Sequence, residues 1–232
     1  MLEVTGLQAG YQADLQILRG VDLRARTGQI TAVLGANGTG KSTLLKTVAG
    51  FLKPVAGTIR LGSTDLTGTP AHEMVRNGLV YVPQEAGVFI DMSVEENLIL
   101  GAWPYRHDRA RIRERLERNF GRFPVLREKR WQRAGELSGG QRRMVELGRA
   151  LMTDPRLLLI DEPTAGLSHR MSYEVYEILA ALRAEGRTLL LVDQQIRDAI
   201  KLADYVYVLD AGRNRREGPA ADFSDVEKSF WW

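Results

Sequence analysis

The chain of 232 residues is long enough to bury a substantial core. Hydrophobic residues make up 44% of it and charged residues 26%, which is ordinary for a globular protein and argues against a disordered or fibrous class. A net charge of +3 is too small to indicate nucleic-acid binding by itself, and the lack of cysteine excludes a disulfide framework and a thiolate metal site.

The apolar runs of the chain are short. LLLI at residues 157–160 is an example, whereas a membrane-spanning helix needs about 20 apolar residues. The first residues, MLEVTGLQAGYQ, contain no basic region followed by an apolar core, so no export signal is predicted. We therefore expect a soluble protein that does not cross a membrane, and a cysteine-free chain suits the reducing cytoplasm.

The first 30 residues alternate apolar and polar positions, which predicts short strands. The run QITAVLG is expected to be a buried strand that ends at a glycine-rich loop. A helix is predicted from Lys41 to the region of Pro54, because four apolar residues follow helical spacing there: Leu44, Leu45, Val48 and Leu52.

Residues 93–153 are predicted to be helical and charged. They open with MSVEENLIL, in which Ser93 and Glu96 have the spacing of a capping box. Residues 106–133 carry many more basic than acidic side chains. This excess is interpreted as solvated helix faces, and contact with an acidic partner or with lipid head groups is the alternative.

Beyond Pro155, strand-like runs (RLLLID, TLLLVD and YVYVLD) alternate with helical stretches. Such alternation predicts the α/β class, with a parallel sheet covered by helices. Neither a linker nor an internal repeat is visible. We therefore expect a single domain over residues 1–232, with a helical insert at about residues 90–150, in preference to two independent domains.

The stretch GANGTGKST matches the phosphate-loop pattern G-x-x-x-x-G-K-[ST]. Its glycines allow successive backbone N–H groups to surround a phosphate chain, and the helix that follows presents its positive N-terminal end. Lys41 is expected to reach the β- and γ-phosphates, and the Ser42 hydroxyl is expected to ligate Mg²⁺. The sequence therefore predicts binding of a nucleoside triphosphate by Gly35, Ala36, Asn37, Gly38, Thr39, Gly40, Lys41, Ser42 and Thr43.

Two acidic residues, Asp161 and Glu162, follow the buried run LLLI. They would lie at the strand edge where ligands bind in open α/β sheets. Asp161 is expected to hold Mg²⁺ directly or through water, and Glu162 is expected to orient or deprotonate the attacking water. Hydrolysis of the bound triphosphate is therefore predicted.

A second anion-binding helix start is predicted in LSGGQRRMVELGRAL, where Ser138 precedes two glycines and a helix. One nucleotide cannot easily occupy two phosphate cradles so far apart in sequence. This stretch therefore points to a second chain.

In their order along the chain, these motifs resemble those of the ATP-binding cassette (ABC) family, and the resemblance covers nearly the whole chain. It includes Gln84 in YVPQ and the stretch AGLS after the acidic strand. The resemblance implies a P-loop NTPase fold with a mainly parallel sheet, an N-terminal antiparallel β subdomain and a helical insert. It also implies two cassettes packed head to tail, so that the ATP of one chain contacts four residues of its partner: Ser138, Gly139, Gly140 and Gln141.

The same resemblance assigns two further contacts. Tyr11 would stack on the adenine, and ordinary packing of this ring is the alternative. Gln84 would contact Mg²⁺ or the attacking water and connect it to the helical insert. The implied cofactors are ATP and Mg²⁺, and the implied metal ligands are Ser42, Gln84 and Asp161.

The chain departs from the commonest family pattern at Gln194, where many members carry a histidine that contacts the γ-phosphate. Its amide can donate a hydrogen bond to phosphate, but it does not titrate near neutral pH. Three interpretations stay open: a γ-phosphate contact with a role in catalysis, a silent substitution, and a site with weak turnover. Ser168 stands where many cassettes carry aspartate, which weakens any inference of communication across the dimer through that loop.

Glutamine at position 194 resembles the variant in one of the two ATPase subunits of branched-chain amino acid importers, and so do the stretches VEENL, RALMTDPRLLLIDEPTAGL and IKLADYVYVLDAG. This implies a peripheral ATPase at the cytoplasmic face of the inner (plasma) membrane. Its partners would be two membrane-spanning permease subunits, a second ABC ATPase subunit in a homo- or heterodimer and, indirectly, a periplasmic or extracellular substrate-binding protein.

Two alternatives to this function remain. The first is an ABC ATPase for urea, an amide, an aromatic acid or a lipid. The second is a non-transport cassette in DNA repair, chromosome organisation or translation. A single cassette without cysteines or heptads argues against the second, and no nucleic-acid partner is expected. The tail EKSFWW, residues 227–232, is expected to pack on the domain or to be exposed, and a contact with a partner is the alternative.

Overall fold

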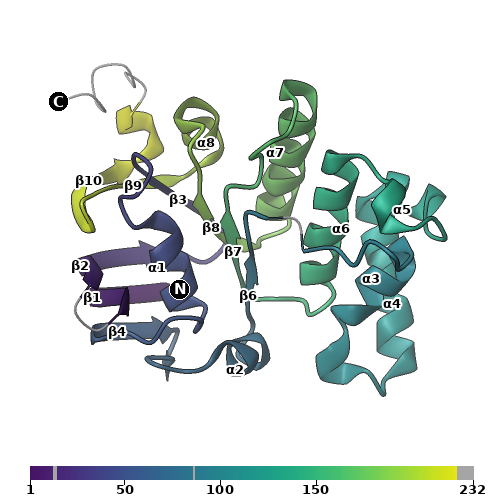
Figure 1. Ribbon diagram of the computed structural model, residues 1–232, viewed down its shortest axis with the longest axis horizontal. Helices are drawn as coiled ribbons and strands as arrows, with labels where there is room; N and C mark the ends of the chain where they lie inside the picture. The colour runs from purple at the N-terminus through teal and green to yellow at the C-terminus, as the bar shows by residue number, and fades with distance from the viewer. Residues whose placement is uncertain (13–14, 86, 224–232) are drawn as a thin grey trace. The chain divides into compact units, whose positions relative to one another are not determined.

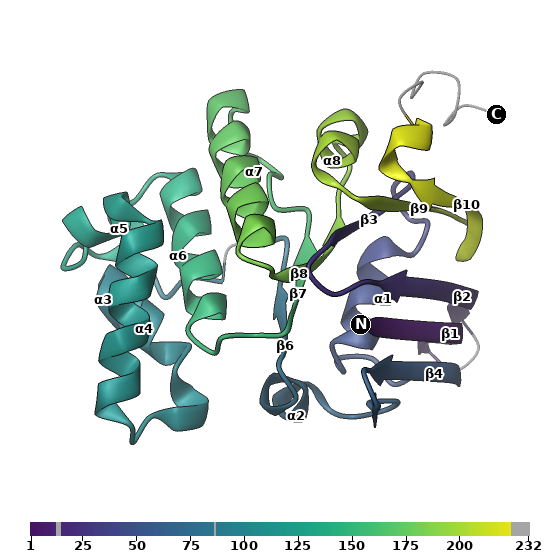
Figure 2. The same ribbon diagram turned by 180° about the vertical axis from the view of Figure 1, so that it is seen from behind.

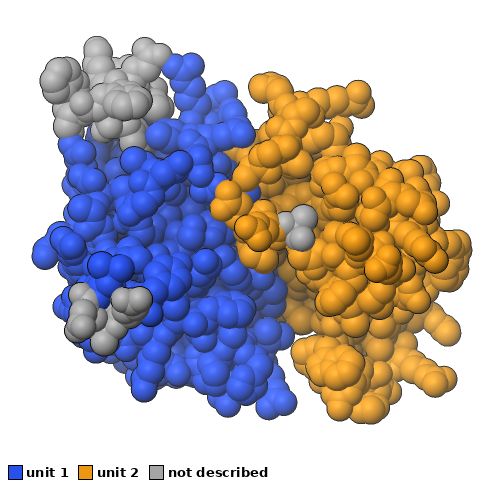
Figure 3. Space-filling view, viewed as in Figure 1, with its two compact units in different colours: residues 1–81, 156–162, 178–232 blue, residues 82–155, 163–177 orange. Residues whose placement is uncertain are grey.

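A computed structural model of the chain describes residues 1–12, 15–85 and 87–223 (Figures 1 and 2). The tail EKSFWW lies outside these residues. The chain divides into two compact units, which Figure 3 distinguishes by colour. The first unit draws on residues 1–81, 156–162 and 178–232, and the second on residues 82–155 and 163–177.

The first unit begins with an antiparallel sheet in which one face is apolar. In the second strand, Leu18, Val21 and Leu23 are buried while Arg19, Asp22 and Arg24 are exposed, the alternation that a half-buried strand requires. The strand order is β2-β1-β4-β5. The strands are β1 (Leu2–Gln12), β2 (Leu15–Ala25), β4 (Ala56–Leu61) and β5 (Thr64–Asp65).

A six-stranded sheet has the order β10-β9-β3-β8-β7-β6. Its strands are β3 (Ile30–Leu34), β6 (Leu79–Val82), β7 (Leu157–Asp161), β8 (Thr188–Val192), β9 (Tyr205–Asp210) and β10 (Arg213–Pro219). β3 runs parallel to β8 and β9, β7 runs parallel to β8, and β10 is antiparallel to β9. Every residue of β3, β7 and β8 is buried, as parallel strands covered on both faces require. The predicted α/β fold is confirmed.

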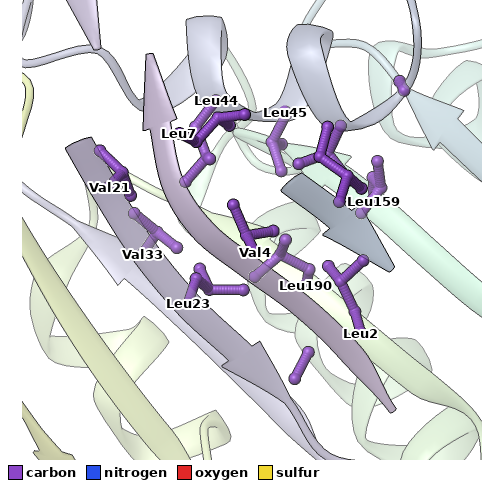
Figure 4. Packing of buried hydrophobic residues seen from close by; sticks show 14 of the residues in the cluster. Leu2, Val4, Leu7, Val21, Leu23, Val33, Leu44, Leu45, Leu159 and Leu190 are labelled. Carbon is purple, nitrogen blue, oxygen red and sulfur yellow. The ribbon is translucent and has the colours of Figure 1, made fainter. Parts of the chain in front are cut away.

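Helix α1 (Lys41–Val48) contributes to a core that both sheets share. Leu44 and Leu45 of this helix lie with apolar side chains of β1, β2, β3, β7 and β8 (Figure 4). The labelled strand residues are Leu2, Val4, Leu7, Val21, Leu23, Val33, Leu159 and Leu190. Buried apolar contacts with both sheets therefore fix the position of α1 and of the loop that leads into it.

Helix α1 ends earlier than its apolar spacing predicts, and Leu52 lies beyond it. Gly50 has a φ of 78°, and a Cβ atom there would lie 2.3 Å from the Thr69 carbonyl oxygen. This close approach favours a left-handed glycine, which stops the helix. The other helical segments of the first unit are α2 (Ala71–Arg76), α8 (Ile196–Leu202) and the 3₁₀ helix η3 (Ala220–Phe223).

The second unit is predominantly helical, as the sequence predicts for the insert. Ser93 and Glu96 form the predicted capping box. The helical segments are α3 (Val94–Leu100), η1 (Trp103–Tyr105), α4 (Arg109–Arg122), α5 (Pro124–Glu128), η2 (Ala134–Glu136) and α6 (Gly139–Leu151). Helix α7 (His169–Ala184) contributes residues to both units. Over residues 1–12, 15–85 and 87–223, no helix has the length and apolar composition that a membrane crossing requires.

Candidate functional site

The loop between β3 and α1 depends on glycine at both of its ends. A Cβ atom on Gly35 would lie 2.4 Å from the Leu209 carbonyl oxygen. Gly40 has a φ of 103°, and a Cβ atom there would lie 2.9 Å from Cδ2 of Leu18. Larger residues would therefore displace the loop from the two sheets. Thr39 closes the turn by donating a 2.9 Å hydrogen bond to the Ala36 carbonyl oxygen.

Lys41, the first residue of α1, points back into this loop. Its Nζ donates hydrogen bonds of 2.9 Å to the carbonyl oxygens of Gly35 and Ala36. The side chain is buried, and burial lowers the pKa of Lys41, while the carboxylates of Glu162, Asp161 and Asp193 act in the opposite direction. Asp193 is a participant that the sequence motifs did not single out. The lysine thus lies among three acidic residues from the ends of β7 and β8.

Asp161, the last residue of β7, is buried and bridges two hydroxyl groups. Its Oδ1 accepts a 3.1 Å hydrogen bond from Ser42 Oγ, and its Oδ2 accepts a 3.0 Å hydrogen bond from Tyr81 Oη. Ser42 and Asp161, which are far apart in sequence, are therefore brought together. Tyr81 lies on β6, next to β7, and no motif in the sequence indicates its contact with Asp161.

The pair Ser42 and Asp161 fits a magnesium ion. A hydroxyl and a carboxylate are hard oxygen donors, and Mg²⁺ is commonly held by one or two carboxylates together with substrate phosphates and water. Within the described parts of the chain, no group of three or more His, Cys, Asp or Glu side chains forms a metal site. Two protein oxygens would leave the other positions around such an ion to phosphate oxygens and water.

Glu162 has an unusual backbone. Its φ is 42°, in the left-handed region, which costs a residue other than glycine about 1–3 kcal/mol. Its N–H donates a 2.8 Å hydrogen bond to the Val192 carbonyl oxygen of β8, and its side chain is buried. Such strain in a non-glycine residue is typical of functional sites.

Gln194 contacts Glu162 directly. Gln194 Nε2 donates a 2.6 Å hydrogen bond to Glu162 Oε1. The register of the parallel strands explains this contact. Asp161 of β7 pairs with Val192 of β8, so the segments that follow the two strands, which carry Glu162 and Gln194, leave the sheet at the same edge. This partner is absent from the interpretations of Gln194 drawn from sequence.

Tyr11 lies at the end of β1 with 53% of its surface exposed. Lys46 Nζ donates a 3.4 Å hydrogen bond to Tyr11 Oη and lies 5.8 Å from the centroid of the Tyr11 ring. Lys46 is a second residue that the motifs did not indicate. An exposed aromatic ring beside a cation can stack on a nucleotide base.

In the second unit, residues 138–141 form the start of α6. Ser138 Oγ accepts a 3.3 Å hydrogen bond from the Gln141 N–H, and Gln141 Oε1 accepts a 3.1 Å hydrogen bond from the Ser138 N–H. Ser138 and Gly139 are exposed, whereas Gly140 is buried. A Cβ atom on Gly140 would lie 1.8 Å from Cε of Met171. The helix start therefore packs closely on α7 and presents its first residues outward.

Gln84, two residues after β6, is also exposed and also belongs to the second unit. Ser42 and Asp161 belong to the first unit. A shared site that includes Gln84 or residues 138–141 therefore stays a prediction.

Comparison with known proteins gives a consistent family. Residues 18–165 match the family model described as ABC transporter. The chain is 40% identical over 203 residues to the high-affinity branched-chain amino acid transport ATP-binding protein BraG of Pseudomonas aeruginosa, covering 88% of this chain and 86% of that protein. It is 37% identical over 229 residues to the probable branched-chain amino acid transport ATP-binding protein LivF of Archaeoglobus fulgidus, covering 98% and 96%.

Another relative is named for a different transport system. The chain is 32% identical over 225 residues to the lipopolysaccharide export system ATP-binding protein LptB of Acidithiobacillus ferridurans, covering 97% of this chain and 92% of that protein. Two solved structures are also similar. A nucleotide-free ATP-binding cassette from an ABC transporter has a TM-score of 0.86 at 27% identity, covering 98% of this chain and 97% of that chain. An ATP-binding cassette in its ADP conformation has a TM-score of 0.83 at 30% identity, covering 94% and 91%.

Proposed function

The chain belongs to the ABC transporter family as an ATP-binding cassette whose ATP hydrolysis is coupled to transport, and from this premise we propose that it serves an importer of branched-chain amino acids. The observation that carries the cargo assignment is the naming of the relatives at 40% and 37% identity, both of which are branched-chain amino acid transport proteins. The lipopolysaccharide export relative is less similar, at 32% identity. A lipid cargo is therefore the alternative that the experiment must distinguish.

We propose that residues 1–232 form one cassette domain with a helical subdomain at about residues 90–150. ATP would lie on the loop of residues 35–43, with its phosphates at the start of α1 and its adenine on Tyr11. The positive N-terminal end of α1 and the Lys41 ammonium both favour phosphate at this place. On binding, the phosphates would replace the carbonyl oxygens of Gly35 and Ala36 as acceptors for Lys41.

Ser42 and Asp161 would hold Mg²⁺, with Gln84 as a further ligand. The ion, when bound, offsets phosphate charge. Asp161 is oriented for this role, because Ser42 and Tyr81 donate hydrogen bonds to both of its carboxylate oxygens. A carboxylate that is already oriented loses less side-chain entropy when it takes up a ligand.

Glu162 would act as the general base on the attacking water, and Gln194 would orient the Glu162 carboxylate. The carboxylate lies in a buried position and accepts a hydrogen bond from a neutral amide. A positioned base of this kind contributes about 10²- to 10⁴-fold to a rate. The left-handed backbone of Glu162 sets the direction in which the side chain leaves β7.

Hydrolysis would occur in a dimer of two cassettes, homo- or heteromeric, in which residues 138–141 of one chain contact the ATP on the other. The outward-facing Ser138 and Gly139 at a helix start support this arrangement. The dimer would act at the cytoplasmic face of the inner membrane on two separate permease subunits, supplied by a periplasmic or extracellular substrate-binding protein.

Reconstitution tests the cargo. The chain would be assembled in vesicles with the permease subunits and the binding protein of a branched-chain amino acid importer from the same genome, and ATP hydrolysis would be measured as binding protein and solute are added. Leucine, isoleucine or valine should stimulate hydrolysis, and the Glu162→Gln variant should not respond. Stimulation by urea, an amide, an aromatic acid or a lipid in place of these amino acids would overturn the cargo assignment.

A further inference from the structure

A buried ion pair lies on α6, one turn beyond the helix start at Ser138. Arg143 Nη1 lies 2.8 Å from Glu146 Oε2, and the two side chains are 5% and 2% exposed. Desolvating two charges is costly, and their attraction compensates for it only where further hydrogen bonds satisfy both groups. The further hydrogen bonds of Arg143 and Glu146 therefore indicate which segments of the chain this pair holds.

Arg143 binds two backbone carbonyl oxygens from different parts of the chain. Its Nε donates a 3.0 Å hydrogen bond to Pro163, and its Nη1 donates a 2.6 Å hydrogen bond to Pro83. Pro163 follows Glu162 directly, and Pro83 precedes Gln84 directly. These segments leave β7 and β6, which are neighbouring strands. One planar guanidinium thus joins the residue after the proposed base to the residue before the predicted glutamine ligand.

Glu146 extends this connection. Its Oε1 accepts a hydrogen bond from the Gly87 N–H, on the other side of Gln84 from Pro83. A Cβ atom on Gly87 would lie 3.3 Å from Arg149 Nη2, so the backbone approaches α6 closely here. The ion pair therefore holds the chain before and after Gln84.

Glu162 needs support on both of its sides. A non-glycine residue stays in the left-handed region only where its surroundings over-determine it. On the N-terminal side, the Glu162 N–H donates to the Val192 carbonyl oxygen at 2.8 Å. On the C-terminal side, the carbonyl oxygen of the following residue, Pro163, accepts a hydrogen bond from Arg143 Nε.

We propose that Arg143, with Glu146 as its counter-ion, is a positioning residue for ATP hydrolysis: it fixes the backbone that carries Glu162 and ties it to the segment that carries Gln84. Arg143 itself touches neither ATP nor water in this proposal. The inference rests on the proposed role of Glu162 as general base. It assigns to α6 a task separate from the contact that its first residues make with a partner's ATP.

The test is Arg143→Lys. Lysine keeps the positive charge beside Glu146 but lacks the rigid fork that reaches both carbonyl oxygens. We expect kcat to fall about 10- to 100-fold, since small displacements of catalytic groups have effects of this size. The KM for ATP and the Kd measured by direct binding should stay close to their wild-type values. The matched control is Arg118→Lys, which makes the same change in an exposed pair with Glu114 and should leave both constants unchanged.

Hydrogen–deuterium exchange gives a second readout that needs no turnover. In Arg143→Lys, the amides of Gly87 and Thr164 should exchange faster, while those of β3 and β8 should keep their protection. Glu146→Gln retains an acceptor for Gly87 but weakens the hold on Arg143, and should show smaller changes of the same kind. This second variant serves if Arg143→Lys does not fold.

Two results would overturn the proposal. One is a kcat equal to that of Arg118→Lys together with unchanged exchange at Gly87 and Thr164. The other is a loss of ATP affinity in proportion to the loss of kcat together with faster exchange throughout the protein, as a purely structural role predicts. A wild-type chain without any turnover would count against the proposed function alone, because the exchange measurement would still decide whether Arg143 holds both segments.

Discussion

Gln194 Nε2 lies 2.6 Å from Glu162 Oε1, and this hydrogen bond joins the ends of two adjacent parallel strands. A neutral amide orients the carboxylate without adding a charge. A histidine at the same place would add one as it titrates. The position that departs from the commonest family pattern is therefore occupied by a group that can serve the proposed base directly.

Replacing Gln194 by methionine should separate its contact with Glu162 from a contact with phosphate. Methionine has a similar length but donates no hydrogen bond. We expect turnover to fall about 10- to 150-fold, because a hydrogen bond to a carboxylate is worth about 1.5–3 kcal/mol. The ratio of the affinities for ATP and ADP should not change. If that ratio falls with turnover, the main contact of Gln194 is the γ-phosphate.

Lys41 should make the stability of the protein depend on alkaline pH. Burial lowers the pKa of Lys41 from 10.5, so between the folded-state pKa and 10.5 the unfolded chain binds more protons than the folded one. The contribution of this lysine to the free energy of unfolding therefore rises with pH in that window. Denaturant unfolding of wild type and Lys41→Met at several pH values measures it as the difference between the two proteins. A difference that is flat or falls towards pH 10.5 would contradict the burial of this charge.

The Lys41→Met variant should also bind nucleotide more weakly. Lys41→Met removes the ammonium proposed to contact the phosphates, and we expect ATP to bind about 10- to 100-fold more weakly. Isothermal titration with ATP measures this change, and wild-type affinity in the variant would remove Lys41 from the proposed site.

Tyr81 should affect magnesium more than nucleotide. Tyr81→Phe removes the 3.0 Å hydrogen bond to Asp161 Oδ2 and leaves that carboxylate less firmly oriented. We expect the Mg²⁺ concentration for half-maximal hydrolysis to rise about 3- to 10-fold, as the loss of one hydrogen bond predicts. Binding of ATP without Mg²⁺ should be unchanged. Tyr173→Phe, on the exposed surface of α7, is the control. An equal Mg²⁺ requirement in all three proteins would argue against Asp161 as a metal ligand.

Gly139 offers a test of the contact with a partner's ATP. A Cβ atom there would meet only Cδ2 of Leu167, at an ordinary 3.4 Å, and alanine in a helix is favoured over glycine by up to about 1 kcal/mol. Gly139→Ala should therefore be at least as stable as wild type, yet its turnover should fall because the methyl group would project towards the partner's nucleotide. Gly121→Ala in α4, where a Cβ atom would meet nothing within 4 Å, should also be at least as stable as wild type, but its turnover should be unchanged. Full turnover in Gly139→Ala would exclude this helix start from the dimer site.

Sequence reasoning worked where the signal is local. The spacing of glycines, Lys41 and Ser42 predicted the loop, and buried apolar runs predicted the strand ends that carry Asp161 and Glu162. The contacts of Tyr81, Gln194 and Arg143 could not be predicted in this way, because each depends on strand order or register. The end of α1 at Val48 was not predicted because it depends on a tertiary contact: a Cβ atom on Gly50, which has a left-handed φ, would lie 2.3 Å from the Thr69 carbonyl oxygen.

The proposed dimer and the role of Glu162 are tested most directly by ATP turnover per chain over a series of protein concentrations, with Glu162→Gln measured beside the wild type. We expect specific activity to rise with concentration as dimers form, alone or after addition of the second ATPase subunit, and we expect the variant to bind ATP but barely hydrolyse it. Equal turnover by wild type and Glu162→Gln, or specific activity independent of concentration down to the most dilute samples, would contradict this proposal.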